Sequence, residues 1–348
     1  MEQNKRVLLG MSGGVDSSVS AILLKEQGYE VIGINMKLCN ANKDSSKDAK
    51  KVCEILDIPY YELDAKKEFK SKVIDYFSNE YSMCRTPNPC IECNKYFKFG
   101  LMYEKAKELN CNYIATGHYA KIEYNEKYKT NVLKKSNSIK KDQSYVLYSI
   151  DKEVLNHVLF PLAEFENKEE IREIARKYNL PVSNKPDSED ICFIPDGNYK
   201  KFLEENSSIR PKVGNIVNRQ GEVLGKHNGL YNYTIGQRKG LGISYKEPLF
   251  VIGFNKDRNE VIVGVEAELY RREMKVDSIN LLLVDKIEKP LDVTVKIRYS
   301  SKEAEGIINQ VDNYIQVIFK EPQRGITKGQ SAVFYIDDVV FGGGKIVD

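Results

Sequence analysis

Short apolar runs alternate with stretches of helical periodicity along the first half of the chain. The apolar runs predict buried β-strands at residues 7–9, 30–37, 60–64 and 113–118. The stretches between and after them predict helices at 46–57, 66–80, 95–109 and 167–179, the last with Asn167 as its N-cap. Strands that alternate with helices predict an α/β fold, in which a parallel sheet is doubly wound and carries helices on both faces.

The pattern changes from about residue 206. Glycines between Gly214 and Gly242 separate short strand-like pieces, and further along apolar and polar residues alternate as in half-buried strands. These later strands are expected at 293–300, 307–311, 314–319, 332–336 and 339–341. We therefore expect a catalytic domain at 1–205, a small central β-rich domain at 206–271 and a C-terminal antiparallel β-barrel at 272–348.

A loop of small residues joins the first predicted strand to the first predicted helix. Residues 10–18 read Gly-Met-Ser-Gly-Gly-Val-Asp-Ser-Ser, so Asp16 opens the helix. Successive backbone N–H groups at such a junction point at an anion, and the acid could hold a Mg²⁺ that bridges phosphate oxygens. The Gly-Lys-Ser/Thr ending of the common phosphate loop is missing. The pattern resembles the loop of enzymes that split ATP into AMP and pyrophosphate; the alternative is a turn that only joins the two elements.

Three residues of different predicted strands support a single nucleotide pocket. Gly10, Met36 and Gly117 all fall at or near the carboxyl end of a strand. Ligands of doubly wound sheets bind at that edge. We expect ATP there.

Composition is that of an ordinary globular protein. The chain has 348 residues, of which 41% are hydrophobic and 30% charged, with a net charge of +3. No apolar run approaches the roughly 20 residues of a membrane span. Because the first strand begins by about residue 6, we expect no signal peptide, no membrane contact and a cytoplasmic location. The global charge neither supports nor excludes RNA as a partner.

The seven cysteines are an odd number, which argues against a disulfide framework in a protein expected in the cytoplasm. Cys84, Cys90 and Cys93 are expected on or beside a loop, because Pro87 and Pro89 stop a helix. A single Cys-x-x-Cys has a metal or redox spacing, but the second pair of a closed zinc site is missing. We expect no structural zinc.

Residues 231–240 read Tyr-Asn-Tyr-Thr-Ile-Gly-Gln-Arg-Lys-Gly. Bases can stack on exposed tyrosines while arginine and lysine bind phosphates. The alternative is a β-module with solvated lysines, and both interpretations stay open here.

Taken in order, the motifs resemble the tRNA-specific 2-thiouridylases, the bacterial MnmA family, which sulfurate the wobble uridine of certain tRNAs. The matching pieces are residues 10–18, 85–89, 93–96, 99–100, 115–120, 141–145, 187–188 with 191–193, 233–238 and 329–335. They span nearly the whole chain in the family's order. The resemblance implies an ATP-pyrophosphatase domain, a small central domain and a C-terminal β-barrel.

The resemblance also implies roles for individual residues. The ATP contacts that it implies are Gly10, Met11, Ser12, Gly13, Gly14, Val15, Asp16, Ser17, Met36 and Gly117. The tRNA contacts that it implies are Asn88, Pro89, Cys90, His118, Lys141, Asp142, Gln143, Arg298, Tyr299 and Gln330. Cys93 matches the family's nucleophile and Cys192 the cysteine that carries the incoming persulfide, and the two would form a transient disulfide.

The implied reaction replaces the C2 oxygen of the uridine with sulfur. ATP first adenylates that oxygen, a sulfur on Cys192 then attacks C2, and Cys93 takes the other half of the persulfide. This needs thiolates on mobile loops, and Lys95 or Arg85 could lower the thiol pKa. The base must leave its stack, which suits an anticodon loop. We expect tRNA and a sulfur-donor protein as partners of a monomer.

Cys90 departs from the family pattern, because many members carry an aspartate there that is cast as a general acid/base. Cysteine could not do that job in the same way. One alternative is that Cys90, Cys93 and Cys192 hold a [4Fe–4S] cluster with one open iron for sulfur delivery. Others are a different AMP-forming tRNA-modifying enzyme, or a non-catalytic protein that kept the fold. The cysteines outside the matched motifs are expected to be structural or incidental: Cys39, Cys53, Cys84 and Cys111.

Overall fold

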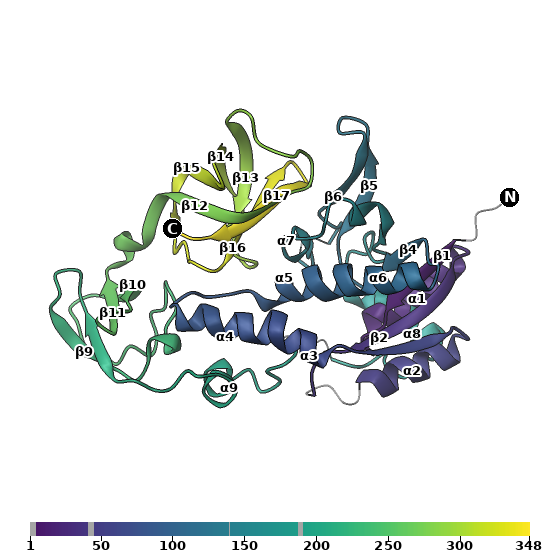
Figure 1. Cartoon of the computed structure of the whole chain (residues 1–348), viewed down its shortest axis with the longest axis horizontal. Helices are drawn as coiled ribbons and strands as arrows, with labels where there is room; N and C mark the ends of the chain where they lie inside the picture. The colour runs from purple at the N-terminus through teal and green to yellow at the C-terminus, as the bar shows by residue number, and fades with distance from the viewer. Residues whose placement is uncertain (1–4, 41–44, 139, 187–190) are drawn as a thin grey trace.

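A five-stranded sheet carries the first half of the chain (Figure 1). The computed structural model of the protein describes residues 5–40, 45–138, 140–186 and 191–348. The strand order is β3-β2-β1-β4-β7, and every pairing in it is parallel. The strands are β1 (Arg6–Gly10), β2 (Glu30–Lys37), β3 (Tyr60–Asp64), β4 (Tyr113–Ala115) and β7 (Val158–Leu159). The predicted parallel sheet is confirmed, and only the two-residue β7 was too short for its pattern to predict.

Helices cover both faces of this sheet. On one face α1 (Val15–Glu26), α2 (Ser45–Ile55) and α8 (Lys168–Lys177) pack over Val7 and Leu9. On the other, the helix that ends with α6 (Met102–Glu108) packs over Leu8. Neighbouring residues of β1 reach opposite faces because side chains alternate along a strand. Within the described residues, no helix is both long enough and apolar enough to cross a membrane.

Two long helical segments cross the middle of the molecule (Figure 1). The first joins α3 (Lys66–Phe69) to α4 (Asp75–Ser82) through a π-helical stretch at Lys70–Ile74. This continuous helical segment confirms the helix predicted at 66–80. The second starts with α5 (Pro89–Cys93) and continues into α6, so it begins six residues before the predicted 95–109. The expectation that Pro89 stops a helix is wrong. At the first helical position a proline lacks only an N–H that needs no partner, and its φ suits the helix.

The central unit is a small four-stranded sheet that follows α9 (Tyr199–Asn206). Its order is β10-β11-β8-β9, and its strands are β8 (Gly214–Val217), β9 (Val223–His227), β10 (Phe250–Asn255) and β11 (Glu260–Gly264). Its core is a separate apolar cluster that includes Ile216, Val251 and Val261. The glycine-rich pieces expected to be short strands do build a β-rich unit.

The last part of the chain closes into an antiparallel barrel, as predicted. The strands are β12 (Tyr270–Leu281), β13 (Leu291–Lys296), β14 (Ala304–Val311), β15 (Tyr314–Arg324), β16 (Ser331–Ile336) and β17 (Val339–Ile346). Closure comes from the pairing of β12 with both β15 and β17. The strand expected at 293–300 ends earlier, at Lys296, and the residues after it form a turn.

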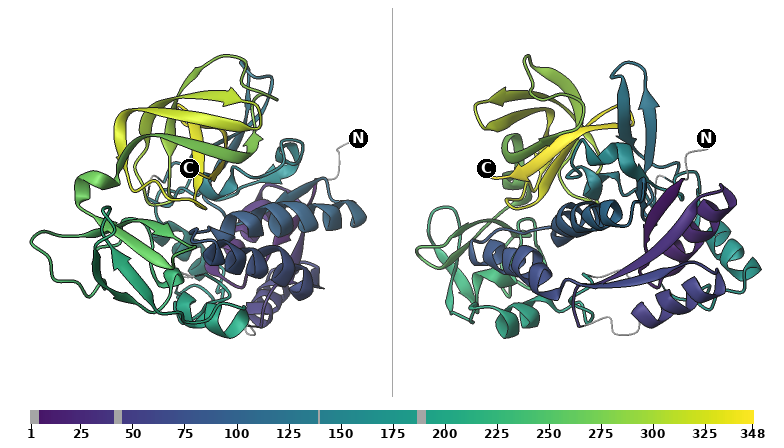
Figure 2. Two further views of the ribbon diagram at one scale, coloured as in Figure 1. Left: turned by 60° about the vertical axis from the view of Figure 1, so that its left-hand side comes forward. Right: turned by 45° about the vertical axis from the view of Figure 1, so that its right-hand side comes forward.

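A hairpin from the first half of the chain joins the sheet of the barrel. It consists of β5 (Lys121–Asn125) and β6 (Thr130–Lys134), and β6 pairs with β17 through Lys134 and Val339. Beside it the buried Tyr145 donates its hydroxyl to the Ser331 carbonyl at 2.8 Å. Both views of Figure 2 show the barrel seated over the long helical segments. The barrel is therefore built onto the N-terminal unit rather than tethered to it.

A buried ion pair fastens the barrel to the helix that carries Cys93. Lys345 Nζ lies 2.9 Å from Glu92 Oε1, and the Glu92 side chain is only 8% exposed. Lys345 also lies over the Tyr76 ring, 4.1 Å from its centroid. A buried carboxylate that loses its cation has no solvent to replace it, so this pair depends on both partners.

We expect Lys345→Met to lower the free energy of unfolding by about 2–3 kcal/mol, because it leaves Glu92 charged and buried. The double variant Glu92→Gln/Lys345→Met should recover part of that loss, and urea denaturation measures both. Lys152→Met is the matched control, since its partner Asp285 is exposed and such pairs contribute less than about 1 kcal/mol. A Lys345→Met protein as stable as the parent would contradict the buried-pair argument.

Candidate active site

The loop between β1 and α1 has the geometry of an anion site. Gly13 has φ +70°, and a Cβ there would lie 2.3 Å from the Ser45 carbonyl oxygen, so only glycine fits. Gly14 is the N-cap and has no side chain to cap the first turn of α1. Ser12 and Ser17 face each other with hydroxyls 3.2 Å apart. The helix therefore presents uncapped N–H groups and two hydroxyls at the carboxyl edge of the sheet.

The loop after β4 packs directly on this loop. A Cβ at Gly117 would lie 2.9 Å from the backbone of both Asp16 and Ser17. Gly10 ends β1, and Met36 lies on the adjacent strand, where it packs on two apolar clusters. The structure thus brings Gly10, Met36 and Gly117 to one edge, as their positions in the sequence predicted.

Not every predicted ATP residue can contact a ligand through its side chain. Met11 and Val15 are 1% and 3% exposed and belong to the core beneath the loop. Only their backbone atoms can face a nucleotide. The role of the loop is therefore one of N–H groups and hydroxyls, not of apolar side chains.

Two lysines that the sequence did not point to reach this loop. Asp16 accepts a hydrogen bond from Tyr119 Oη at 2.9 Å and pairs with Lys168 Nζ at 2.6 Å. Lys185 Nζ donates to the Gly13 carbonyl at 2.9 Å. Both lysines lie more than 150 residues from the loop, so no local pattern could have indicated them.

Cys93 lies at the end of α5, the first turns of a helix, rather than on a mobile loop. Asn88 caps this helix, its Oδ1 accepting from the Cys90 N–H at 3.1 Å, and Pro89 takes the first helical position. Cys93 is 7% exposed and packs in an aromatic cluster with Phe97. Cys84 lies in a turn, and Cys90 and Cys93 lie in the helix that directly follows the irregular residues 85–88, so the three are on or beside a loop as expected.

Cys192 reaches the same cluster from a loop 99 positions later in the chain. Its neighbour Phe193 is buried against Phe69 and Phe77, with ring centroids 5.8 and 5.5 Å away. Cys192 itself is exposed, and its thiol is close enough to that of Cys93 to raise its pKa. The structure therefore brings together the two cysteines that the resemblance paired. Asp187 and Ser188, which belong to the same motif, lie outside the described residues.

A third thiol belongs to this region. Cys39 follows β2, and its Sγ lies 3.8 Å from the Cys192 carbonyl oxygen. It also raises the pKa of Cys93 and Cys192. The expectation that Cys39 is incidental misses this position. Cys39 comes just after a predicted strand, at the same sheet edge as Met36, and this position in the sequence could have indicated that it lies near the site.

Loss of solvation among protein atoms raises the pKa of both thiols, although the Cys192 residue as a whole is exposed to solvent. It raises the pKa of Cys93 to about 11 and that of Cys192 to about 12. Neighbouring thiols add to the shift, and the ammonium of Lys98 opposes it. The favourable charge thus comes from Lys98 and not from Lys95 or Arg85, which lie against the Tyr96 ring and Glu80.

His118 is part of the interior, although a tRNA contact was expected. Its Nδ1 lies 2.7 Å from Thr116 Oγ1 and its Nε2 3.3 Å from Lys98 Nζ. The side chain is buried, and burial together with Lys98 lowers its pKa well below the usual value. A neutral His118 can hold the Lys98 ammonium close to the thiols.

Several other expected tRNA residues make internal contacts. Arg298 donates to the Ile235 and Gly325 carbonyls at 3.1 and 2.8 Å, and Gln330 donates to the Thr86 carbonyl at 2.7 Å. These bonds link the barrel to the central unit and to the segment before α5.

The remaining residues of that set lie where the barrel meets the hairpin region. Gln143 accepts from the Tyr119 N–H at 2.9 Å, and Asp142 accepts from Ser144. Tyr299 Oη donates a hydrogen bond to the Asp142 carbonyl at 3.3 Å. Lys141, in the same segment, is partnered as well. Burial, Asp142 and Cys90 together raise the pKa of Tyr299, so this tyrosine lies within electrostatic range of Cys90.

The described cysteines do not form a metal site. In the ranges that the structure covers, which include Cys90, Cys93 and Cys192, no group of three His, Cys, Asp or Glu side chains lies close enough to hold one ion. A [4Fe–4S] cluster needs its thiols at ligating distance, so the arrangement of these described residues does not support the cluster alternative.

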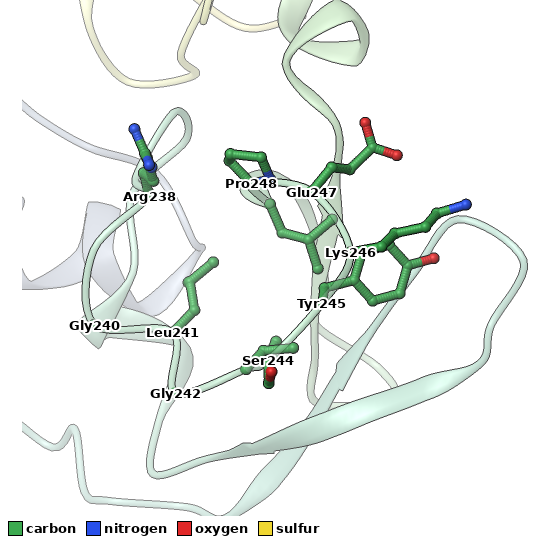
Figure 3. Close-up of a pocket in the computed structure, with 11 residues that line it drawn as sticks. Arg238, Gly240, Leu241, Gly242, Ser244, Tyr245, Lys246, Glu247 and Pro248 are labelled. Carbon is green, nitrogen blue, oxygen red and sulfur yellow. The ribbon is translucent and has the colours of Figure 1, made fainter.

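A separate hollow lies in the central unit and not at the cysteines (Figure 3). It has a volume of about 680 Å³ and is lined by the segment from Arg238 to Leu249, with Tyr245 and Lys246 on its wall. It is open and formed largely by one loop, so it adds nothing to the chemistry of the site.

Comparison with known proteins identifies the family. Residues 5–196 match the tRNA methyl transferase HUP domain, 200–265 the tRNA methyl transferase PRC-barrel domain and 271–346 the aminomethyltransferase beta-barrel domain. The tRNA-specific 2-thiouridylase MnmA of Clostridioides difficile is 46% identical, with 99% of each chain covered. The protein of the same name from Clostridium perfringens is 48% identical, with 98% of each covered. Because these matches run over essentially the full length, the chain belongs to the family of tRNA-specific 2-thiouridylases.

Proposed function

We propose that this chain is an ATP-dependent tRNA sulfurtransferase that converts the wobble uridine to 2-thiouridine. One observation carries the proposal. Cys93 belongs to an apolar cluster that also takes in Ile191 and Phe193, the two neighbours of Cys192 in the chain, and Met36 at the edge of the sheet packs on the same cluster. Sulfur transfer to a carbonyl needs both an activating nucleotide and a thiol carrier, and this edge supplies both.

ATP serves to turn the uridine oxygen into a leaving group. The residues at Gly10–Ser17, with Met36 and Gly117, are proposed to bind ATP while the C2 oxygen attacks its α-phosphate. That step releases pyrophosphate and leaves the oxygen as an adenylate. The uncapped N–H groups of α1 and the hydroxyls of Ser12 and Ser17 would stabilise the phosphate charge.

Sulfur then arrives as a persulfide on Cys192. Its terminal sulfur attacks C2, the C2–O bond breaks and AMP leaves. The Cys93 thiolate next attacks Cys192 Sγ, the S–S bond breaks, and its electron pair stays on the sulfur of the 2-thiouridine. A Cys93–Cys192 disulfide remains, and an external dithiol reduces it back to two thiols.

The description of the matched HUP domain mentions methyl transfer, but the site favours sulfur. Two thiols whose charges influence each other have no task in methyl transfer, whereas a persulfide relay uses both. The full-length relatives are named 2-thiouridylases. We therefore keep sulfur transfer as the single proposed chemistry.

Magnesium fits one residue of the loop. Asp16 carries the only carboxylate of residues 10–18, and its two oxygens offer about four lone-pair sites, more than Tyr119 and Lys168 use. With ATP bound, Asp16 together with the phosphates would hold the ion. Mg²⁺ would there offset the charge of the departing pyrophosphate.

The proposed partners follow from the reaction. A wobble uridine lies in the anticodon loop, so that loop of the tRNA must reach Cys93 and Cys192. Asn88 and Pro89 begin the helix that carries Cys93, and Tyr299 lies within electrostatic range of Cys90. A sulfur-donor protein must also reach Cys192, whose exposure permits that transfer. We propose a monomer that works in the cytoplasm, where its tRNA substrate is found.

A thiolation assay tests this function. It combines unmodified tRNA, ATP, Mg²⁺, a dithiol and a cysteine-desulfurase sulfur supply, and mass spectrometry measures 2-thiouridine. The wild type should form it, whereas Cys192→Ser and Cys93→Ser should form none, because each lacks one half of the relay. Cys90→Asp should keep activity, since the relay does not use the Cys90 thiol.

Cys111→Ser is the matched control for this assay. Cys111 precedes β4 and so lies at the amino edge of the sheet, away from the cluster. It should thiolate tRNA like the wild type. ATP-to-AMP turnover without any 2-thiouridine in the wild type would contradict the proposed substrate, and an active Cys192→Ser protein would contradict the relay.

The raised thiol pKa predicts an unusual pH dependence of alkylation. Because the pKa of Cys192 is about 12, little thiolate exists near neutral pH. Solvent reaches the exposed Cys192 and screens part of this shift, so iodoacetamide should modify it at least about tenfold more slowly than free cysteine at about pH 7.5. The rate should keep rising about tenfold per pH unit through about pH 10, where an ordinary thiol has reached its plateau.

Lys98→Met provides the internal comparison. The variant removes the charge that opposes the pKa shift, so Cys192 alkylation at about pH 9 should slow roughly fivefold. Peptide mass spectrometry measures both rates. A plateau near pH 9 in the wild type would show that its surroundings do not raise this thiol's pKa.

A further inference from the structure

The ATP loop has no positive charge of its own. Between Arg6 and Lys25 the sequence contains neither lysine nor arginine, and the loop's one charged residue is Asp16. The common phosphate loop carries a lysine within its motif that reaches the β- and γ-phosphates. A polyphosphate with several negative charges therefore needs cations from elsewhere in the fold.

Lys168 is the first such cation. It is the first residue of α8, and its Nζ lies 2.6 Å from Asp16 Oδ2. The Lys168 side chain is only 14% exposed, so its position is defined by the protein rather than by solvent. Tyr119 Oη holds the other oxygen of Asp16 at 2.9 Å. The ammonium therefore stands at the first turn of α1, where the phosphates are expected.

Lys185 is the second cation, and it contacts a different part of the loop, at Gly13. Its Nζ donates to the Gly13 carbonyl at 2.9 Å and to Asp48 Oδ2 at 2.6 Å. These two contacts use two of the three N–H donors of an ammonium. The third would be the donor to a phosphate oxygen held by the loop.

Charge explains why the lysines come with acids. Asp16 and Asp48 hold the ammonium groups in place before any nucleotide arrives, which lowers the entropy lost on binding. Without Lys168, the Asp16 carboxylate would repel the phosphates that its own helix attracts. Each pair is thus neutral in the free protein, with its cation already at the loop.

We propose that Lys168 and Lys185 are phosphate-binding residues that hold the pyrophosphate half of ATP from two sides. This inference rests on the proposed cleavage of ATP to AMP and pyrophosphate, because it assigns these residues to the leaving group. In this assignment the two lysines do not contact the adenosine or the α-phosphate. Both lysines come from the stretch between β7 and Cys192. The part of the chain that leads to the proposed sulfur carrier therefore also supplies the cations of the nucleotide site.

Binding measurements on the full chain test the assignment. Isothermal titration calorimetry with ATP·Mg²⁺, inorganic pyrophosphate and AMP compares wild type, Lys168→Met and Lys185→Met. Each variant should lose roughly 10- to 100-fold in affinity for ATP and pyrophosphate, the loss typical of one charge-assisted hydrogen bond. Affinity for AMP, which lacks the β- and γ-phosphates, should stay within about twofold.

Two further variants serve as controls for the charge and for the position of the lysine. Lys168→Arg keeps the charge and should retain most of the pyrophosphate affinity, while Lys177→Met removes an exposed lysine from the far end of α8 and should behave as wild type. Thermal unfolding shows that each variant is folded.

The results separate this inference from the proposed function. Variants that bind pyrophosphate as tightly as the wild type, or that lose AMP affinity by the same factor, would overturn the assignment alone. A wild-type protein that binds neither ATP nor pyrophosphate would overturn the proposed function and the assignment with it.

Discussion

The contact between the barrel and the start of the α5 helix holds the active site together. The Thr86 N–H donates to the Lys328 carbonyl at 2.9 Å, Gln330 donates back to the Thr86 carbonyl, and the Lys345–Glu92 ion pair lies next to Cys93. Separate folding of the two units would leave Glu92 without its cation. Because this contact forms, the barrel and the helix that carries Cys93 have a fixed position relative to each other.

The site combines two environments with opposite electrostatics. At the ATP loop, uncapped N–H groups and paired lysines are arranged to receive negative charge. Around Cys93, burial among aromatic rings raises the thiol pKa, and the Lys98 ammonium opposes that shift. Thiols that stay protonated are less exposed to oxidation and stray alkylation between turnovers.

Local pattern was a good guide wherever the chemistry is local. The apolar runs located β1 to β4, and the glycines and serines after β1 located the anion loop. Asn167 was expected as a cap, and its side chain does accept from the Glu170 N–H. Pattern failed at Pro89, because a proline both ends and begins helices, and the difference depends on a cap at Asn88. Local pattern also did not indicate that Arg298 donates a hydrogen bond to the central unit and that Gln330 donates one to the Thr86 carbonyl.

The sequence by itself determined the α/β class and the family, because each depends on residues adjacent in the chain or on motifs in a fixed order; the ATP loop and the cysteine pair that it predicts remain predictions. The tertiary structure alone decided which distant groups meet. It placed Lys168 and Lys185 at the loop, Cys39 and Lys98 beside the thiols, and the hairpin of β5 and β6 on the edge of the barrel. Such contacts form between residues far apart in sequence, and they arise from packing and desolvation of whole elements, which no window of neighbouring residues encodes.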